Sequence, residues 1–195
     1  MDTSSEIRAA VDFIQTGGQA PHPPDVVAAL LSAEKESKRH KQRYAYEDLL
    51  GAWQLGFVSG TQTKKTSGKK PMKTVGNGRF VPGFVAIAIT YQQDAVSNTV
   101  INAVTLGPLN LTLTGPTRFW PKTNSLAFDF TTLQIKLGDL SLYDGSIRGG
   151  RERAQTFKAQ SLKDQAFFTF FTVAPDHIAA RGKGGGLALW TRKPG

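Results

Sequence analysis

The sequence contains no cysteine, so disulfides, thiolate metal ligands and thiol nucleophiles are all excluded. It also contains no apolar run close to the roughly 20 residues that an α-helix needs to cross a bilayer. Its first residues, MDTSSEIRAAVDF, have neither the basic nor the apolar segment of a secretory signal. We therefore expect a protein that is neither secreted nor held by a transmembrane segment, and whose fold depends on a packed core alone.

Motifs for catalysis are also missing. The three histidines, His22, His40 and His177, have no second histidine or carboxylate at metal-ligand spacing. No G-x-S-x-G motif occurs, and the glycines at 76–78 and 182–186 do not match a dinucleotide-binding or phosphate-binding loop. We predict no catalytic residue, no metal and no cofactor, and hence a protein that is not an enzyme.

Acidic residues are scarce relative to basic ones, 15 against 24, which gives a formal net charge of +9. Most of the excess falls in two clusters, at residues 35–43 and 64–73. A clustered positive field attracts acidic lipids and nucleic acids alike, and a solvated basic face is the alternative. The lysines that we predict to contact a membrane surface or another anion are Lys64, Lys65, Lys69, Lys70 and Lys73.

The N-terminal quarter of the chain has helical patterning. Thr3 and Glu6 have the spacing of a capping box, and apolar residues follow at helical intervals. A second helix is expected from Asp25, apolar in its first turns and almost entirely polar beyond them. We predict a helical segment at 1–48 that packs on or beside a β domain at 49–195, the two forming one structural domain.

Beyond this segment the apolar period changes from helical spacing to every second residue. The expected strands are residues 53–59, 84–91, 99–106, 109–114, 126–137, 139–143, 166–173 and 186–192. Short connections between them favour antiparallel pairing. We predict a mainly β fold, or α+β if the N-terminal helices are counted: an antiparallel β-barrel of about eight strands, covered by those helices. A filled sandwich fits the same pattern.

Three stretches depart from regular patterning. In residues 126–137 the apolar positions are even-numbered at first and odd-numbered later, which predicts a bulge or bend at Thr131 and Thr132. Residues 59–78 have no apolar pattern and are expected to be a long mobile loop. Residues 149–163 form a basic connector for which both a short helix and a strand fit.

The C-terminal region is expected to form a long-loop hairpin. Two β-prone runs, at 167–173 and 187–191, are separated by a polar segment that contains Asp176 and Arg181. These two residues could hold the polar end of a ligand, or they could satisfy the loop by an ion pair or by capping its N–H groups. We favour the structural role.

Two segments carry a resemblance to a known family. Residues 50–55 read LGAWQL, and residues 176–192 read D-x-x-x-x-R-G-x-G-G-G-L-x-L-x-x-R. Together they resemble the plastid-lipid-associated protein family, the fibrillins of plastoglobules and thylakoids, and their cyanobacterial relatives. The motif positions that the resemblance carries over are Trp53, Asp176, Arg181, Gly182 and Leu187.

The resemblance implies a lipocalin-like, calycin-type barrel that binds a hydrophobic small molecule such as a carotenoid, a quinone or a lipid. It also implies a place on the cytoplasmic or stromal side, peripheral to thylakoid membranes or lipid bodies. The sequence departs from the family at Phe57, where tyrosine is usual, and at residues 177–180. The aromatic residues that we predict to contact the ligand are Trp53, Phe57, Phe128, Phe130, Phe168, Phe170 and Trp190.

The leading hypothesis is therefore non-catalytic binding of a hydrophobic molecule at photosynthetic membranes or lipid bodies. A basic nucleic-acid-binding module is an alternative, although the aromatic residues lie in apolar strands and are not interleaved with the lysine clusters. A calycin-type protein that handles a tetrapyrrole, or a bilin lyase, is a third hypothesis that depends on fold analogy alone.

Overall fold

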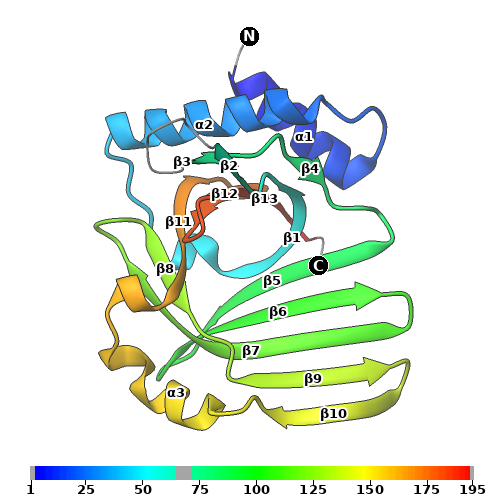
Figure 1. The fold of residues 1–195 in the computed structure, drawn as a ribbon, viewed down its shortest axis with the longest axis vertical. Coiled ribbons are helices and arrows are strands. Elements are labelled where there is room, and N and C mark those ends of the chain that lie inside the picture. Colours follow the sequence, from blue (N-terminus) through cyan, green and yellow to red (C-terminus); the bar gives the residue numbers. More distant parts are fainter. Residues whose placement is uncertain (1–2, 65–71, 194–195) are drawn as a thin grey trace.

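The computed structural model describes residues 3–64 and 72–193, and two N-terminal helices lie across one side of a ring of strands (Figure 1). Helix α1 spans Thr3–Thr16 and helix α2 spans Pro23–Arg39, two residues before the expected start at Asp25. Proline suits the first turn of a helix because its missing N–H would have no partner there. Lys38 Nζ lies 2.8 Å from Glu34 Oε1, one turn away.

The strands follow from β1 to β13, with one 3-10 turn, η1 (Glu47–Leu49), before them. They are β1 (Gly51–Val58), β2 (Thr61–Lys64), β3 (Met72–Val75), β4 (Arg79–Phe80), β5 (Val85–Gln93), β6 (Asn98–Leu106), β7 (Leu109–Trp120), β8 (Ser125–Phe128), β9 (Thr132–Leu137), β10 (Leu140–Ser146), β11 (Ala166–Val173), β12 (His177–Gly182) and β13 (Leu187–Arg192).

Eight of these strands close into an antiparallel barrel, in the order β7, β6, β5, β1, β13, β12, β11, β8 and back to β7. All the pairings in this ring are antiparallel, and β8 closes it by pairing with both β7 and β11. The predicted fold class, an antiparallel barrel of about eight strands with the N-terminal helices packed on it, is confirmed.

The set of strands in the ring differs from the predicted set. Residues 177–182, expected in a polar loop, form β12, which lies between β11 and β13, so the predicted C-terminal hairpin is wrong. The four residues from His177 to Ala180 contain only one β-branched side chain, Ile178, and two alanines. Their sequence therefore does not predict a strand. They nevertheless suit it, because Ile178 and Ala180 fill the barrel while Ala179 lies under the helices.

The predicted break within residues 126–137 is confirmed. Phe128 of β8 pairs with Thr117 of β7, whereas Thr132 of β9 pairs with Thr114, so three residues oppose two on β7. Gly115 lies at this bulge, where a Cβ would approach the Asp129 carbonyl oxygen to 1.9 Å. The bulge takes β9 and β10 out of the ring, and both strands extend an open sheet beside the barrel (Figure 1).

Two further segments are now defined. Within residues 59–78, expected to be a loop, β2 and β3 pair as an antiparallel hairpin, and residues 65–71 lie outside the described residues. Residues 149–163 are helical: α3 (Gly150–Thr156), η2 (Phe157–Ala159) and η3 (Leu162–Asp164). The helical alternative is therefore the right one for that connector.

Buried side chains form two cores, one on each side of the barrel wall. The outer core lies between the helices and the barrel and consists of Ile7, Ala10, Val11, Val26, Val27, Ala29, Leu30, Phe57, Phe171, Ala179, Leu187 and Leu189. The inner core fills the barrel and consists of Tyr46, Leu49, Trp53, Ile89, Tyr91, Val100, Leu126, Phe170, Ile178, Ala180, Ala188 and Trp190. Adjacent residues of β11, Phe170 and Phe171, contribute to different cores at a bulge.

Candidate functional site

The barrel wall parts between β1 and β5. The two strands pair only from Gly51 with Tyr91 to Gln54 with Ala88. After a bulge between Leu55 and Phe57, β1 pairs instead with the short strand β4. The first residues of β5 therefore lie beyond the ring, and β5, β6, β7, β9 and β10 continue as the open sheet, toward the right in Figure 1.

One face of this open sheet continues the lining of the barrel. Directly paired residues share a face, so the positions in register with the inner-core residues Ile89 and Val100 can be followed outward across the strands. We call the part beyond the inner core the inner face; it consists of Val85, Ile87, Asn102, Val104, Leu106, Leu109, Leu111, Leu113, Leu133, Ile135 and Leu137. All of these side chains except that of Asn102 are aliphatic.

The inner face is partly open to solvent. Ile89 and Val100 are 5% and 0% exposed, whereas Leu106 and Leu137 at the far end of the same face are 46% and 47% exposed. The other aliphatic residues of the face are intermediate. Sheets in monomeric proteins normally bury such a face against another layer. This apolar surface is therefore a candidate binding surface.

Aromatic side chains gather where the barrel meets this surface. The Phe168 ring stacks on Phe128 at 5.1 Å between centroids and meets Trp190 edge-on at 5.2 Å. Phe130 lies 5.5 Å from Phe128, and Phe170 lies 6.4 Å from Phe168. Phe128, Phe130 and Phe168 are only partly buried against the inner core. The structure thus brings five of the seven predicted ligand residues together.

The other two predicted aromatic residues are fully buried. Trp53 belongs to the inner core, donates its indole N–H to the Leu49 carbonyl at 2.7 Å, and carries the Arg192 guanidinium 3.7 Å from its ring centroid. Phe57 belongs to the outer core and contacts Phe80 edge-on at 5.0 Å. A ligand on the inner face would have to displace core packing to reach either ring.

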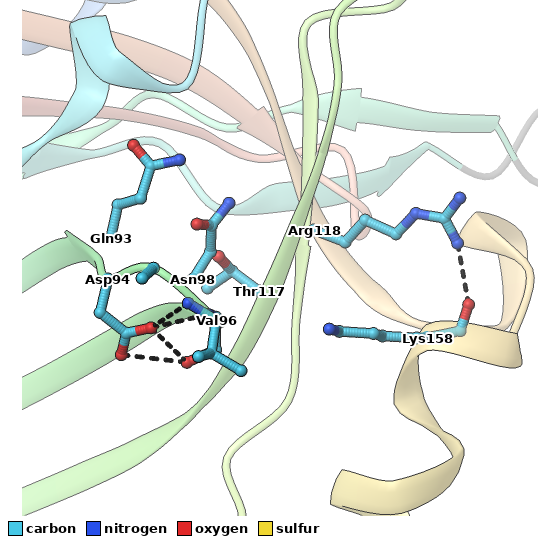
Figure 2. A pocket seen from close by; sticks show the side chains of 9 residues that line it. Gln93, Asp94, Val96, Asn98, Thr117, Arg118 and Lys158 are labelled. Carbon is cyan, nitrogen blue, oxygen red and sulfur yellow. Dashed lines mark hydrogen bonds between the residues drawn. The ribbon is translucent and has the colours of Figure 1, made fainter.

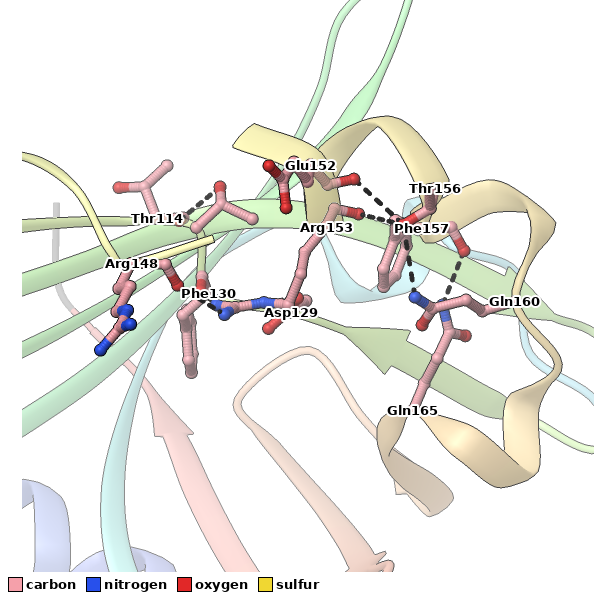
Figure 3. Close-up of polar contacts among 11 residues, drawn as sticks. Thr114, Asp129, Phe130, Arg148, Glu152, Arg153, Thr156, Phe157, Gln160 and Gln165 are labelled. Atoms are coloured by element: carbon pink, nitrogen blue, oxygen red, sulfur yellow. Dashed lines mark hydrogen bonds and ion pairs between the residues drawn. The ribbon is translucent and has the colours of Figure 1, made fainter. Parts of the chain in front are cut away.

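Helix α3 holds the bulge from which Phe130 projects. Arg153 donates from Nε to Asp129 Oδ2 at 2.8 Å and from Nη2 to the Phe130 carbonyl at 2.8 Å (Figure 3). Its Nη1 donates to the Arg148 carbonyl at 3.1 Å, and Gly150 abuts the Thr131 carbonyl. Arg153 thus holds the backbone at Asp129 and Phe130, and so it positions the Phe130 ring.

A cavity of about 250 Å³ lies at the seam where β1 leaves β5. We call it the seam pocket; it is lined by Phe13, Ile14, Gly17, Gln54, Leu55, Gly56, Phe80, Val81, Pro82, Gly83 and Val85. Leu55 packs against the inner core and Val85 begins the inner face, so the pocket adjoins both. Helix α1 covers it through Phe13 and Ile14.

Two other pockets lie elsewhere on the barrel. The larger, about 550 Å³, lies between the β5–β6 turn, β7 and η2, and its lining is polar, with Arg118 and Lys158 (Figure 2). There Asp94 accepts hydrogen bonds from the Val96 and Ser97 amides, which lower the pKa of its carboxyl. The other, about 330 Å³, lies between the basic end of α2 and β11.

Asp176 and Arg181 hold the two helices to the barrel and do not pair with each other. Arg181 Nε donates to Glu34 Oε1 of α2 at 2.8 Å, and Arg8 of α1 lies 2.6 Å from Asp176. Burial alone would raise the pKa of Glu34, but the hydrogen bonds from Arg181 and Lys38 outweigh it and lower that pKa. The structural role favoured for these motif residues therefore has identified partners.

The structure describes only two of the five lysines that are predicted to contact a membrane or another anion. Lys64 ends β2 and Lys73 lies in β3, on neighbouring positions of one hairpin. Lys65, Lys69 and Lys70 lie outside the described residues. Their contact with a membrane or another anion stays a prediction.

No group of three or more His, Cys, Asp or Glu side chains within 3–64 and 72–193 could hold a metal ion. Burial raises the pKa of Tyr91, so this inner-core phenol stays neutral near pH 7. Within the same residues, no helix is both long and apolar enough to cross a bilayer.

Comparisons with known proteins assign no family. No family model matches the chain, and no curated protein matches it. Among solved structures, a redesigned β-barrel has a TM-score of 0.31 and 10% identity, covering 77% of this chain and 96% of its own. Another redesigned barrel, mFAP1 bound to DFHBI, has a TM-score of 0.30 and 9% identity, covering 76% and 98%. The fibrillin resemblance stays a hypothesis.

The sequence left the aliphatic part of the site unidentified. Its signal was the alternation of Leu109, Leu111 and Leu113 with polar residues, which shows that one face is apolar but not what covers it. The pairings of β5 with β6 and of β6 with β7 show that this face continues the barrel lining, and the pairing of β9 with β7 extends it.

Proposed function

We propose that this protein binds a hydrophobic small molecule or lipid without catalysing a reaction, with the ligand lying along the inner face. The observation that supports it is the continuity between the apolar lining of the barrel and a partly exposed aliphatic sheet face. Burying that face against a ligand would remove apolar surface from water, which favours binding at about 25 cal/mol per Å². The aromatic cluster packs against the inner core from which this surface continues.

The experiment is a titration of the purified protein with an apolar dye that fluoresces only in a non-aqueous environment. Leu113→Lys places a charge on the inner face and is expected to weaken dye binding at least about tenfold. Thr112→Lys, on the opposite face of the same strand, is the matched control and is expected to leave binding unchanged. Equal binding by both variants would contradict the proposed site.

We further propose that the protein works at the surface of a photosynthetic membrane or lipid body, as the fibrillin resemblance implies, and that its ligand is a carotenoid, a quinone or a lipid. Supporting this is an apolar row across the end of the open sheet, where Leu106, Leu137 and Leu140 are 46%, 47% and 62% exposed. Phe84, which precedes β5 at the same end, is 73% exposed. We call these four residues the end row.

The end row lies at the edge of the inner face. Val85 pairs with Leu106, Leu109 pairs with both Leu106 and Leu137, and Leu137 pairs with Leu140, so one row crosses all five strands. An apolar ligand leaving a lipid phase at this end would reach the inner face without crossing water.

A further inference from the structure

One side chain of the inner face is polar. Asn102 of β6 pairs directly with Ile89 of β5 on one side and with Leu113 of β7 on the other. Its neighbours on the same face of its own strand are Val100 and Val104. The side chain is partly buried and lies where the closed lining, with Ile89 at 5% exposure, gives way to the open part of the face.

The Asn102 amide has no hydrogen-bond partner among the residues that the structure describes. A side-chain amide offers two N–H donors and one carbonyl acceptor, and because Asn102 is only partly buried, water reaches its amide in the free protein and a ligand could replace that water. Asparagine is also depleted in strands, where valine or leucine would continue the surface.

Charge is absent from the same surface. The residues that make up the inner face include no acid or base, and the inner-core phenol of Tyr91 stays neutral. A carboxylate or phosphate placed there would lose water without gaining a counter-ion, which is unfavourable. An uncharged carbonyl or hydroxyl group could pair with the amide.

We propose that the ligand is an uncharged apolar molecule with one carbonyl or hydroxyl group, and that this group hydrogen-bonds to the Asn102 amide while the hydrocarbon part lies on the aliphatic residues around it. This inference rests on the proposed function and adds to it the chemical class of the ligand and a residue that selects it. Asn102 thus sets specificity, and the aliphatic face supplies affinity.

The test compares dodecanol, dodecane and dodecanoate as competitors of the apolar dye on the native protein. Dodecanol is expected to compete about fivefold to tenfold more strongly than dodecane, which is the effect of one net hydrogen bond, and dodecanoate is expected to compete most weakly. In Asn102→Leu the advantage of dodecanol over dodecane should vanish, while dodecane competes at least as well as before.

Two controls keep the result interpretable. Thr112→Leu changes a polar residue to leucine on the opposite face of the neighbouring strand and should preserve the dodecanol preference. Asn102→Val, which suits a strand, replaces Asn102→Leu if melting shows that the leucine variant is misfolded. An undiminished dodecanol preference in the Asn102 variants would overturn this inference while leaving the proposed function intact. Failure of the native protein to bind the dye or any of the three compounds would overturn both.

Discussion

Single residues far apart in the sequence hold the helices against the barrel. Arg181 of β12 and Glu34 of α2 are 147 positions apart, and the Glu34 side chain is only 8% exposed. The pair between Arg8 and Asp176 does the same for α1, but its side chains are 59% and 33% exposed. The Arg181–Glu34 pair is also bidentate, whereas Arg8 makes one hydrogen bond to Asp176, so the two ion pairs should differ in what they contribute to stability.

Arg181→Met is expected to lower the free energy of unfolding by about 2 kcal/mol or more, because it leaves the buried Glu34 carboxylate with Lys38 alone. Arg8→Met is the matched control, and we expect it to cost less than about 1 kcal/mol because its partner stays hydrated. Urea unfolding of the two variants gives both values. Equal losses of unfolding free energy in the two variants would show that the burial of Glu34 adds nothing to the strength of its ion pair.

Acid should weaken the same contacts. The hydrogen bonds from Arg181 and Lys38 overcome the effect of burial on Glu34, and those from His177 and Arg8 do so for Asp176, so the folded-state pKa of each carboxyl lies below its ordinary value. Because the unfolded chain then binds more protons, their contribution is complete above about pH 5 and is lost as pH falls through the lowered folded values.

Glu34→Gln is therefore expected to flatten the fall of stability below about pH 5 relative to the native protein. Urea midpoints measured in steps from neutral to acidic pH give the two slopes. An identical acid slope in the variant would mean that Glu34 does not titrate differently in the folded and unfolded states.

At the scale of elements, the bulge between β8 and β9 decides which strands belong to the barrel. Gly115→Ala places a methyl group 1.9 Å from the Asp129 carbonyl oxygen, a backbone atom that cannot turn away. We expect a loss of about 2 to 3 kcal/mol in unfolding free energy. Gly83→Ala, where an added Cβ meets nothing within 4 Å, should cost less than about 1 kcal/mol.

If Gly115→Ala were as stable as Gly83→Ala, the bulge would have to relax without cost. Hydrogen exchange of the β9 amides would then show whether β9 still pairs with β7. Retained protection would mean that the close approach of Gly115 is not needed to position the open sheet.

The sequence predicted the barrel, the covering helices and the break after β8, because each has a periodic apolar signal. It did not predict β12, because a strand of small residues buried on both faces lacks that signal. The number of ring strands was right although β12 was missed, because β10 was counted in its place and β9 was merged with β8 in one predicted strand. Local periodicity does not show which strands pair when they are far apart in the sequence, as β1 and β13 are.

The site was predicted to a similar degree. The predicted ligand contacts of the aromatic residues stay a prediction, and periodicity could not separate Phe57, which lies under the helices, from Phe128 and Phe168, which pack against the inner core. Asn102 had a visible signal, being the polar exception among the even-numbered apolar positions of residues 99–106. Its meaning depends on what β5 and β7 place beside it.

At the scale of the whole molecule, the proposed contact with a lipid phase can be tested at the end row. Changing Leu106, Leu137 and Leu140 together to glutamine is expected to reduce binding to vesicles with acidic lipids at least about tenfold, because exposed apolar side chains are what such a surface buries. Co-sedimentation with these vesicles measures the binding of the native protein and of the triple variant. Val96→Gln, at the opposite end of the sheet and 85% exposed in the native protein, is the control and should bind normally.

Unchanged sedimentation of the triple variant would place membrane contact elsewhere, and the lysines at 64–73 would then be tested by changing Lys64, Lys65, Lys69, Lys70 and Lys73 to glutamine. Binding that depends on these lysines should weaken with added salt, whereas apolar insertion should not.

The order of strands around the ring has a consequence for synthesis on the ribosome. Helices α1 and α2 are made first, yet their partners β11, β12 and β13 are made last, and β1 closes the ring only by pairing with β13. During synthesis the two helices therefore lack these barrel partners until residues 166–192 have been added. Because the contacts join residues far apart in the sequence, the barrel is expected to fold slowly for its size.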